Sequence, residues 1–221
     1  MNSLSNILDI SIALPEIFLS LWLLIFIPLG VYSGGNKLSR QSYFSVFSII
    51  GLLGTFIILL MMDHKASIGF FDLVINYRLV VYLKGLILLS TIVVLLISEK
   101  YRSIENLYIF EYPLLILISI LGMLVMLSSN DFITLYLGLE LQSLSLYVLA
   151  STKKDSLKSS EAGLKYFILG ALASGFFLFG VSLLFGITGT TSFTLLSFNY
   201  LNSSDISLLL IFSVVLIISS I

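Results

Sequence analysis

Seven long apolar runs dominate this 221-residue sequence. Each run is close to the length of about 20 residues that an α-helix needs to cross the hydrocarbon core of a bilayer. Lipid offers peptide groups no hydrogen-bond partners, so such runs are expected to form helices, which bond their backbone internally. The alternating pattern of a membrane β-barrel does not occur in the sequence. The predicted helices lie at about 10–32, 43–62, 79–97, 112–127, 132–150, 162–187 and 206–221.

The composition agrees with an all-α integral membrane protein that forms one membrane domain over residues 1–221. Hydrophobic residues make up 58% of the chain and charged residues only 10%, whereas a soluble domain carries about 25% charged residues. The net charge of −1 offers no basic surface, so we expect no nucleic-acid partner. The absence of cysteine excludes cysteine-ligated iron–sulfur clusters, and the lone histidine, His64, cannot form a metal site by itself.

The basic residues of the predicted loops indicate an orientation. The first nine residues, MNSLSNILD, contain no basic segment and predict neither a secretory signal nor a transit peptide. Two basic residues, Lys65 and Arg78, flank the even-numbered loops. Basic residues favour the matrix or cytoplasmic side, so we expect the odd-numbered loops there and the N-terminus on the opposite side. The seven basic residues assigned to the odd-numbered loops are Lys37, Arg40, Lys100, Arg102, Lys153, Lys154 and Lys158.

Glu140 is the ionisable residue predicted deepest in the membrane. It is nine residues into the 132–150 helix, and therefore about 12 Å from the start of that helix at 1.5 Å per residue. Tyr136, Ser143 and Tyr147 fall on the same helical face. A carboxyl group among hydroxyl groups at this depth predicts a site on an ion pathway. The alternative is a structural glutamate that pairs once and never titrates.

Lys165 is the second candidate, near the start of the 162–187 helix. Its long side chain could extend to the membrane interface, or the residue could serve ion transfer, and the residues around it favour neither interpretation. Glu161 lies one turn before it. The opposite face of the helix is small and predicts close helix packing. That face carries Gly163, Gly170 and Ser174.

Lys84 and Glu16 are predicted to have ordinary roles. Lys84 lies near the outer end of the 79–97 helix, which is its N-terminal end, and its ammonium group is expected to reach the interface there. Glu16 follows Pro15 at the start of the first helix, where a carboxylate is favoured by the helix dipole.

Two long segments resemble a known family. SSNDFITLYLGLELQSLSLYVLA and KSSEAGLKYFILGALASGFFLFGVSLLFGITGTTSF are similar, in order and spacing, to subunit 2 of the proton-pumping NADH:ubiquinone oxidoreductase, complex I. LPEIFLSLW and EYPLLILISILGMLVMLSS resemble the first and fourth helices of that family. The resemblance is strong over 111–193 and weaker before. It implies the N-terminal half of the antiporter-like (Mrp-type) fold, of the mitochondrial type. KYFILGALASGFFLFG resembles mitochondrial and bacterial forms more than a chloroplast-type relative.

The resemblance also implies a function. Glu140 and Lys165 match the glutamate and the lysine that the family places in its fifth and sixth helices for proton translocation. The chain itself would hold no redox centre, while NAD, FMN, iron–sulfur clusters and ubiquinone would belong to the parent complex. Expected partners are other membrane-arm subunits and membrane lipids such as cardiolipin. The expected location is the mitochondrial inner membrane, with the N-terminus facing the intermembrane space.

The family's further key lysines lie in a broken seventh helix and beyond it, and none of them is matched here. We therefore expect a separately encoded chain to carry the C-terminal half of subunit 2, so that the two chains form one split subunit. Natural truncation is the alternative to such a split. Two other functions remain open. One is a subunit of a multisubunit cation/proton antiporter, and the other is a structural or assembly half-subunit with no active proton path.

Overall fold

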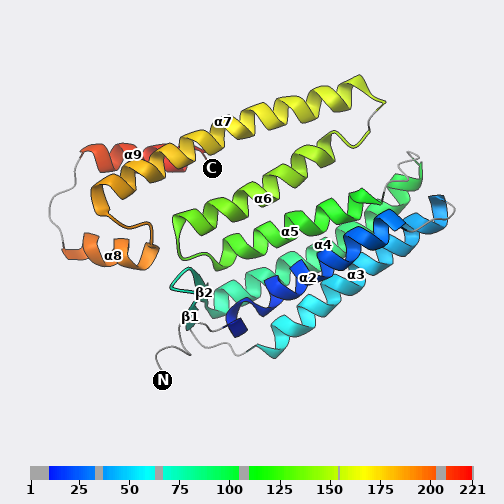
Figure 1. Cartoon of the computed structure of the whole chain (residues 1–221), viewed down its shortest axis with the longest axis horizontal. Coiled ribbons are helices and arrows are strands. Elements are labelled where there is room, and N and C mark those ends of the chain that lie inside the picture. The colour runs from blue at the N-terminus through cyan, green and yellow to red at the C-terminus, as the bar shows by residue number, and fades with distance from the viewer. Residues whose placement is uncertain are drawn as a thin grey trace.

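The chain is a bundle of helices that run back and forth between two ends of the molecule (Figure 1). The computed structural model describes residues 10–32, 37–62, 67–104, 110–153, 155–202 and 208–220. Six helices are long and apolar enough to cross a membrane, which confirms the predicted fold class. The elements are η1 (Ile10–Ala13), α2 (Leu14–Tyr32), α3 (Lys37–Met61), β1 (Ser67–Gly69), β2 (Val74–Asn76), α4 (Arg78–Ile104), α5 (Glu111–Ser128), α6 (Phe132–Ala150), α7 (Leu157–Thr188), α8 (Phe193–Asn202) and α9 (Leu208–Ser220).

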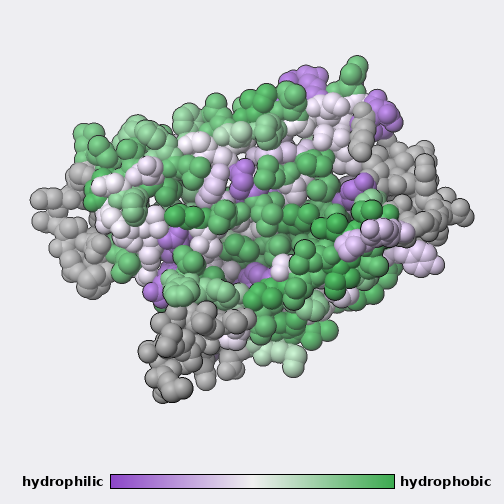
Figure 2. All heavy atoms as spheres, in the orientation of Figure 1, coloured by the Kyte–Doolittle hydropathy of each residue, from purple (hydrophilic) through white to green (hydrophobic). Residues whose placement is uncertain are grey.

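We name the two ends of the bundle by their connections. The hairpin end carries the β1–β2 hairpin, the α5–α6 turn and the α7–α8 turn, and the loop end carries the α2–α3, α4–α5 and α6–α7 connections (Figure 1). Apolar side chains cover most of the face shown in Figure 2, as expected for a surface in contact with lipid. Hydrophilic residues gather at the loop end of α7 (Figure 2).

Helices occupy the first six predicted ranges, and the seventh range contains α9. The first predicted helix begins as η1 and continues as α2 from Leu14. α3 and α4 extend six or seven residues further at one end and α7 starts five residues earlier, whereas the other ends agree within about two residues. α9 is described over 13 residues, Leu208–Ser220, and the other positions of its predicted range, 206, 207 and 221, lie outside the described residues. The two termini, Met1 and Ile221, lie outside the described residues, so the predicted sides of both ends stay predictions.

Two elements fall where loops were predicted. One is α8, and the other is the β1–β2 hairpin, in which Ile68 pairs with Ile75. The hairpin turn holds three consecutive non-glycine residues with positive φ, from Phe70 to Asp72, which is strained backbone. Asn130 stabilises this turn, because its Nδ2 donates to the Asp72 carbonyl at 2.8 Å.

The bundle contains two separate hydrophobic cores. The first joins α2, α3, α4 and α5 and is built around side chains such as Leu19, Leu52 and Leu117. The second joins α7, α8 and α9, with α6 packed against it. Its buried members are Phe177, Val181, Leu184, Leu196 and Ile217.

The two cores meet where α5 packs against α6 through a pair of glycines. A Cβ atom placed on Gly122 would lie 2.7 Å from the Gly138 carbonyl oxygen. A Cβ on Gly138 would lie 2.8 Å from the Met126 nitrogen. The backbones themselves are therefore in contact, which only residues without a side chain permit.

Most helix hydroxyl groups bond within their own helix. Ser48, Thr55 and Thr91 are buried, and each donates at 2.7 Å to a carbonyl three or four residues earlier. This pattern satisfies a polar group without a partner helix. Ser128 and Ser174 differ, because each has a carboxylate on another helix as an acceptor. The Ser128 hydroxyl also lies 2.9 Å from the Leu124 carbonyl of its own helix, a second acceptor.

Candidate functional site

A polar cavity of about 250 Å³ lies between α6, α7 and the end of α9. Glu140 lines it together with Tyr136, Ser143 and Tyr147, the same-face neighbours that helical spacing predicted. The second wall comes from the small face of α7, and Ser220 contributes from α9. The α7 residues on the wall are Tyr166, Gly170, Ala173, Ser174 and Phe177.

Glu140 has one hydrogen-bond donor from another helix in this cavity. The hydroxyl of Ser174 donates to Glu140 Oε2 at 2.8 Å. Gln142, two residues further along α6, also lines the cavity, and its buried Oε1 has no partner among the described residues. Buried polar atoms are normally bonded, and a polar space of this size holds water readily. The carboxyl group is therefore half-buried at mid-depth, beside a neutral donor and a polar space.

The small face of α7 allows α6 to approach, as predicted. A Cβ atom on Gly170 would lie 1.7 Å from the Tyr147 hydroxyl oxygen, and one on Gly163 would lie 2.6 Å from Ser151 Cβ. Tyr147 also packs edge-on against Tyr166, with ring centroids 4.7 Å apart. These contacts hold Tyr147 in place at the side of the cavity that is nearer the loop end.

Lys165 lies outside this cavity. It is the ninth residue of α7, its side chain is 68% exposed, and its Nζ pairs with Glu161 at 2.5 Å within the same helix. The neighbouring residue, Tyr166, lines the cavity, whereas Lys165 is not among the described lining residues. The two residues predicted to act in proton translocation are thus not in direct contact, and the role of Lys165 stays a prediction.

The structure contradicts the ordinary roles predicted for Glu16 and Lys84. The two side chains form an ion pair with each other, and Glu16 Oε1 also accepts the Ser128 hydroxyl at 3.0 Å. Lys84 cannot extend to the interface because it lies on the buried face of α4, in line with Val81 and Leu88. That three-to-four-residue spacing was readable from the sequence and could have shown that Lys84 faces the interior of the bundle, although not that Glu16 is its partner.

Arg102 was counted among the loop charges, but the structure places it inside the last turn of α4. Its side chain is fully buried, and its Nη2 donates to the Ser45 hydroxyl at 2.7 Å. The guanidinium group lies over the Tyr112 ring, 4.8 Å from the centroid. Arg102 is therefore a buried residue of the bundle and not a loop charge, so it does not support the predicted orientation.

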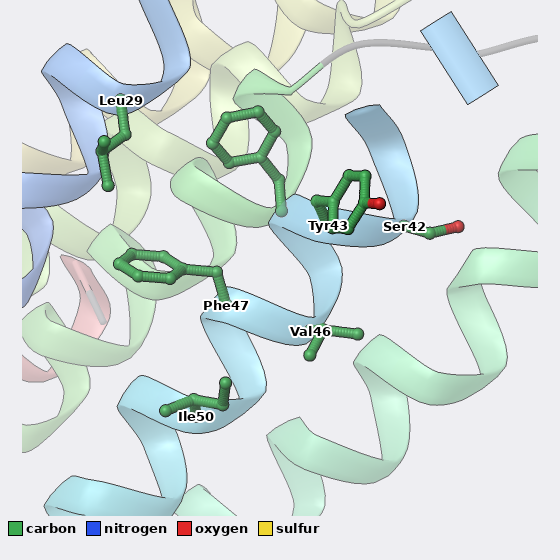
Figure 3. Close-up of a pocket in the computed structure, with 7 residues that line it drawn as sticks. Leu29, Ser42, Tyr43, Val46, Phe47 and Ile50 are labelled. Carbon is green, nitrogen blue, oxygen red and sulfur yellow. The ribbon is translucent and has the colours of Figure 1, made fainter. Parts of the chain in front are cut away.

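Two larger grooves are almost entirely apolar. The first, about 760 Å³, runs along the outer face of α2 and α3 and is lined mainly by carbon atoms (Figure 3). The second, about 560 Å³, lies between α3 and α4. No acidic, lysine, arginine or histidine side chain is among the described residues that line either groove. The residues of the first groove are Leu29, Ser42, Tyr43, Phe44, Val46, Phe47 and Ile50.

A family model and several bacterial proteins match parts of this chain. The family model "NADH:quinone oxidoreductase/Mrp antiporter, TM" matches residues 129–221, which contain the whole Glu140 cavity. The chain is similar to NADH-quinone oxidoreductase subunit N of bacteria. It is 41% identical to that of Bartonella bacilliformis over 214 residues, covering 96% of this chain and 43% of the relative. It is 44% identical to that of Pelagibacter ubique over 200 residues, covering 90% and 42%.

Solved structures share the fold. A chain of respiratory complex I from Thermus thermophilus with bound aureothin superposes with a TM-score of 0.72 at 25% identity, covering 94% of this chain and 43% of that chain. A chain of the membrane-bound sulfane sulfur reductase, an archaeal respiratory membrane complex, superposes with a TM-score of 0.73 at 22% identity, over the same shares. The second likeness shows the fold alone.

The chain spans about two fifths of the length of the curated relatives it matches, between 37% and 43%. These relatives are bacterial, so they support a subunit of the bacterial type, and the mitochondrial type rests on the sequence resemblance alone.

Proposed function

We propose that this chain is the N-terminal part of a membrane-arm subunit of a proton-translocating NADH:quinone oxidoreductase, and that Glu140 takes up and releases the proton. The observation that carries the proposal is the cavity at mid-depth in α6, where the Glu140 carboxyl group lies among hydroxyl groups. An ionisable group at this depth in the membrane is energetically costly, and such groups are found mainly on ion or proton pathways. The similarity to subunit N and to a chain of complex I supports the same function.

The cavity suits an electrostatic mechanism. The Ser174 hydroxyl donates to Glu140 Oε2. A cation brought towards the cavity would pair with a charged Glu140 carboxylate, and withdrawal of the cation would allow the carboxylate to take up a proton. The resemblance implies a lysine shortly beyond α9 as that cation. Ser220 lines the cavity, so α9 points towards the place where such a lysine would act.

The electron-transfer chemistry is proposed to reside on other subunits. The sequence has no cysteine, so this chain offers no thiolate ligand for an iron–sulfur cluster. NAD, FMN, iron–sulfur clusters and the quinone would be bound elsewhere in the complex. This chain would contribute proton transfer alone, driven by changes in the pairing of Glu140.

Proposed partners are other membrane-arm subunits, membrane lipids and a chain that carries the C-terminal half of the subunit. The apolar grooves on α2, α3 and α4 suit acyl chains, including those of cardiolipin. The bacterial relatives favour a plasma membrane, whereas the sequence resemblance favours the mitochondrial inner membrane. Separate encoding of the second half stays a prediction. Affinity purification of the native complex followed by mass spectrometry tests it, because one polypeptide spanning both halves would contradict it.

The decisive experiment replaces Glu140. We expect Glu140→Gln to lower proton pumping per electron while assembly of the complex is retained, because glutamine keeps the shape and removes the titrating group. Glu140→Asp should have a milder effect. Pumping is measured in vesicles as acidification relative to NADH oxidation. Normal stoichiometry in a fully assembled Glu140→Gln complex would overturn the proposal.

A second candidate function is a subunit of a multisubunit cation/proton antiporter. The matching family model carries both descriptions, so the fold fits either. Copurification of flavin, iron–sulfur clusters and quinone reductase activity with this chain would favour the oxidoreductase. Cation-driven proton exchange without them would favour the antiporter.

A further inference from the structure

Glu16 and Lys84 form a buried ion pair that the Glu140 mechanism does not use. Their side chains are 9% and 3% exposed, and they join α2 to α4. Ser128, the last residue of α5, completes the group by donating to Glu16. Three helices therefore converge on one carboxylate at the hairpin end, the opposite end from the basic loops.

The two oxygens of the Glu16 carboxylate differ in their bonding. Oε1 accepts hydrogen bonds from both Lys84 and Ser128. Oε2 is equally buried and has no hydrogen-bond partner in the described part of the chain. A structural ion pair gains from satisfying every lone pair, because a buried carboxylate oxygen without a donor is costly. Oε2 is thus the atom of this pair that is free to take a proton.

Buried polar residues continue from this group to α6. Ser128 is followed by Ser129, Asn130 and Asp131, all of which are buried. Asp131 caps α6 by accepting the Ile133 amide at 2.7 Å. The ion pair is therefore linked through a polar turn to the helix that carries Glu140.

We propose that Glu16 and Lys84 form a second proton-transfer site, located at the hairpin end of the bundle. In the first step Glu16 Oε2 takes a proton from a water molecule, and the carboxylate becomes a carboxylic acid. The Lys84 ammonium group, having lost its counter-charge, releases a proton to water and becomes an amine. Transfer of the proton from the acid to the amine then restores the ion pair. One proton enters and one leaves, so the cycle balances.

The inference rests on the proposed proton-translocating function but concerns different residues. The sharpest test is Lys84→Arg in the intact complex. Arginine keeps the positive charge and the ion pair but does not release its proton. A purely structural pair would survive this change, whereas a proton-transfer site would not. We expect the complex to assemble and proton pumping per electron to fall at least about twofold.

Arg102→Lys is the matched control, because it makes the reverse exchange at the buried cation near the other end of the same helix. Proton pumping per electron in the assembled Arg102→Lys complex should be normal. If Lys84→Arg blocks assembly, the neutral double variant Glu16→Gln/Lys84→Met replaces it as the test. That variant removes both charges together, so it should assemble and still pump poorly.

The outcomes separate this inference from the proposed function. Normal pumping in the Lys84→Arg complex, or in the neutral double variant, would overturn the second site. Failure of both variants to assemble would assign the pair to structure alone and also contradict it. Glu140→Gln is measured in parallel. Loss of pumping there with normal pumping in Lys84→Arg would reject only the second site, whereas normal pumping in Glu140→Gln would reject the proposed function.

Discussion

Hydroxyl groups of two helices donate to the carboxylates that carry the proposals. Ser174 and Ser128 donate to Glu140 and Glu16, whereas hydroxyls such as that of Thr55 bond to a carbonyl of their own helix. A third hydroxyl, that of Thr191 in the α7–α8 turn, donates to Asp131, the N-cap of α6. A hydrogen bond to a charged group contributes about 1.5–3 kcal/mol, roughly twice a neutral one. The serines that bond across helices are therefore the ones whose loss should change function.

Ser174→Ala should lower proton pumping without preventing assembly. The substitution removes the donor to Glu140 Oε2, and losing about 1.4 kcal/mol of this interaction corresponds to a tenfold change in an equilibrium. We expect a decrease of about three- to tenfold in pumping per electron, and a shift of the Glu140 carboxyl band in difference infrared spectra. Ser174→Thr, which keeps the hydroxyl, should retain most activity. An unshifted band in Ser174→Ala would contradict the assignment.

Lys165→Ala should have a weaker effect than Glu140→Gln. The Lys165 side chain is exposed and pairs with Glu161, and exposed pairs of this kind contribute about 0.3–0.5 kcal/mol. Pumping per electron in the two variants, prepared in the same strain, checks the order. A larger loss in Lys165→Ala would show that the assembled complex brings this lysine into the proton path.

For single residues, the sequence predicted which side chains share one face of the same helix. Tyr136, Ser143 and Tyr147 share the cavity with Glu140, as spacings of three, four and seven residues require. The Ser174 bond was not predictable, because helical periodicity carries no information about which residue of a neighbouring helix lies opposite. The Glu16–Lys84 pair was missed for the same reason, although each residue was recognised as ionisable.

Among the elements, helices were predictable and short connections were not. Hydropathy determines a membrane helix, so α6 was predicted at its observed bounds. The hairpin between Ser67 and Asn76 lacks a turn with Asn-Gly or Asp-Gly and instead holds Phe70–Asp72 at positive φ. Its turn depends on Asn130, which is 58 residues away from its bonding partner in the sequence.

The contact between α5 and α6 should be intolerant of side chains. Gly122→Ala or Gly138→Ala would place a methyl group within 3 Å of the facing backbone, and overpacking of this kind costs about 1–3 kcal/mol. We expect a lower melting temperature of the detergent-solubilised complex. Gly186→Ala is the control in a neighbouring helix, because a Cβ there meets nothing within 4 Å. Equal melting temperatures for all three variants would contradict the close approach.

In the whole molecule, successive helices run in opposite directions, so the connections between them lie alternately at the two ends of the bundle. Of the basic residues assigned to the odd-numbered loops, Lys37, Arg40, Lys100, Lys153 and Lys158 lie towards the loop end, and the β1–β2 hairpin lies at the opposite end (Figure 1). Because basic residues favour the matrix or cytoplasmic side, the loop end is predicted to face it.

The absence of native cysteine makes this orientation directly testable. Phe71 and Asp155 are exposed residues at the hairpin end and the loop end. A membrane-impermeant maleimide should label Asp155→Cys only from the matrix or cytoplasmic side, and Phe71→Cys only from the other side. Labelling of both variants from the same side would contradict the predicted topology.

The hydroxyl pattern has a consequence for biogenesis. Helices whose serines and threonines bond to their own carbonyls can enter the bilayer singly, without waiting for neighbours. α2 cannot, because its Glu16 is synthesised 68 residues before Lys84 and 112 residues before Ser128. A nascent chain must therefore hold an unpaired carboxylate until α4 emerges from the ribosome. This delay predicts that α2, α3 and α4 leave the insertion machinery together, as one unit.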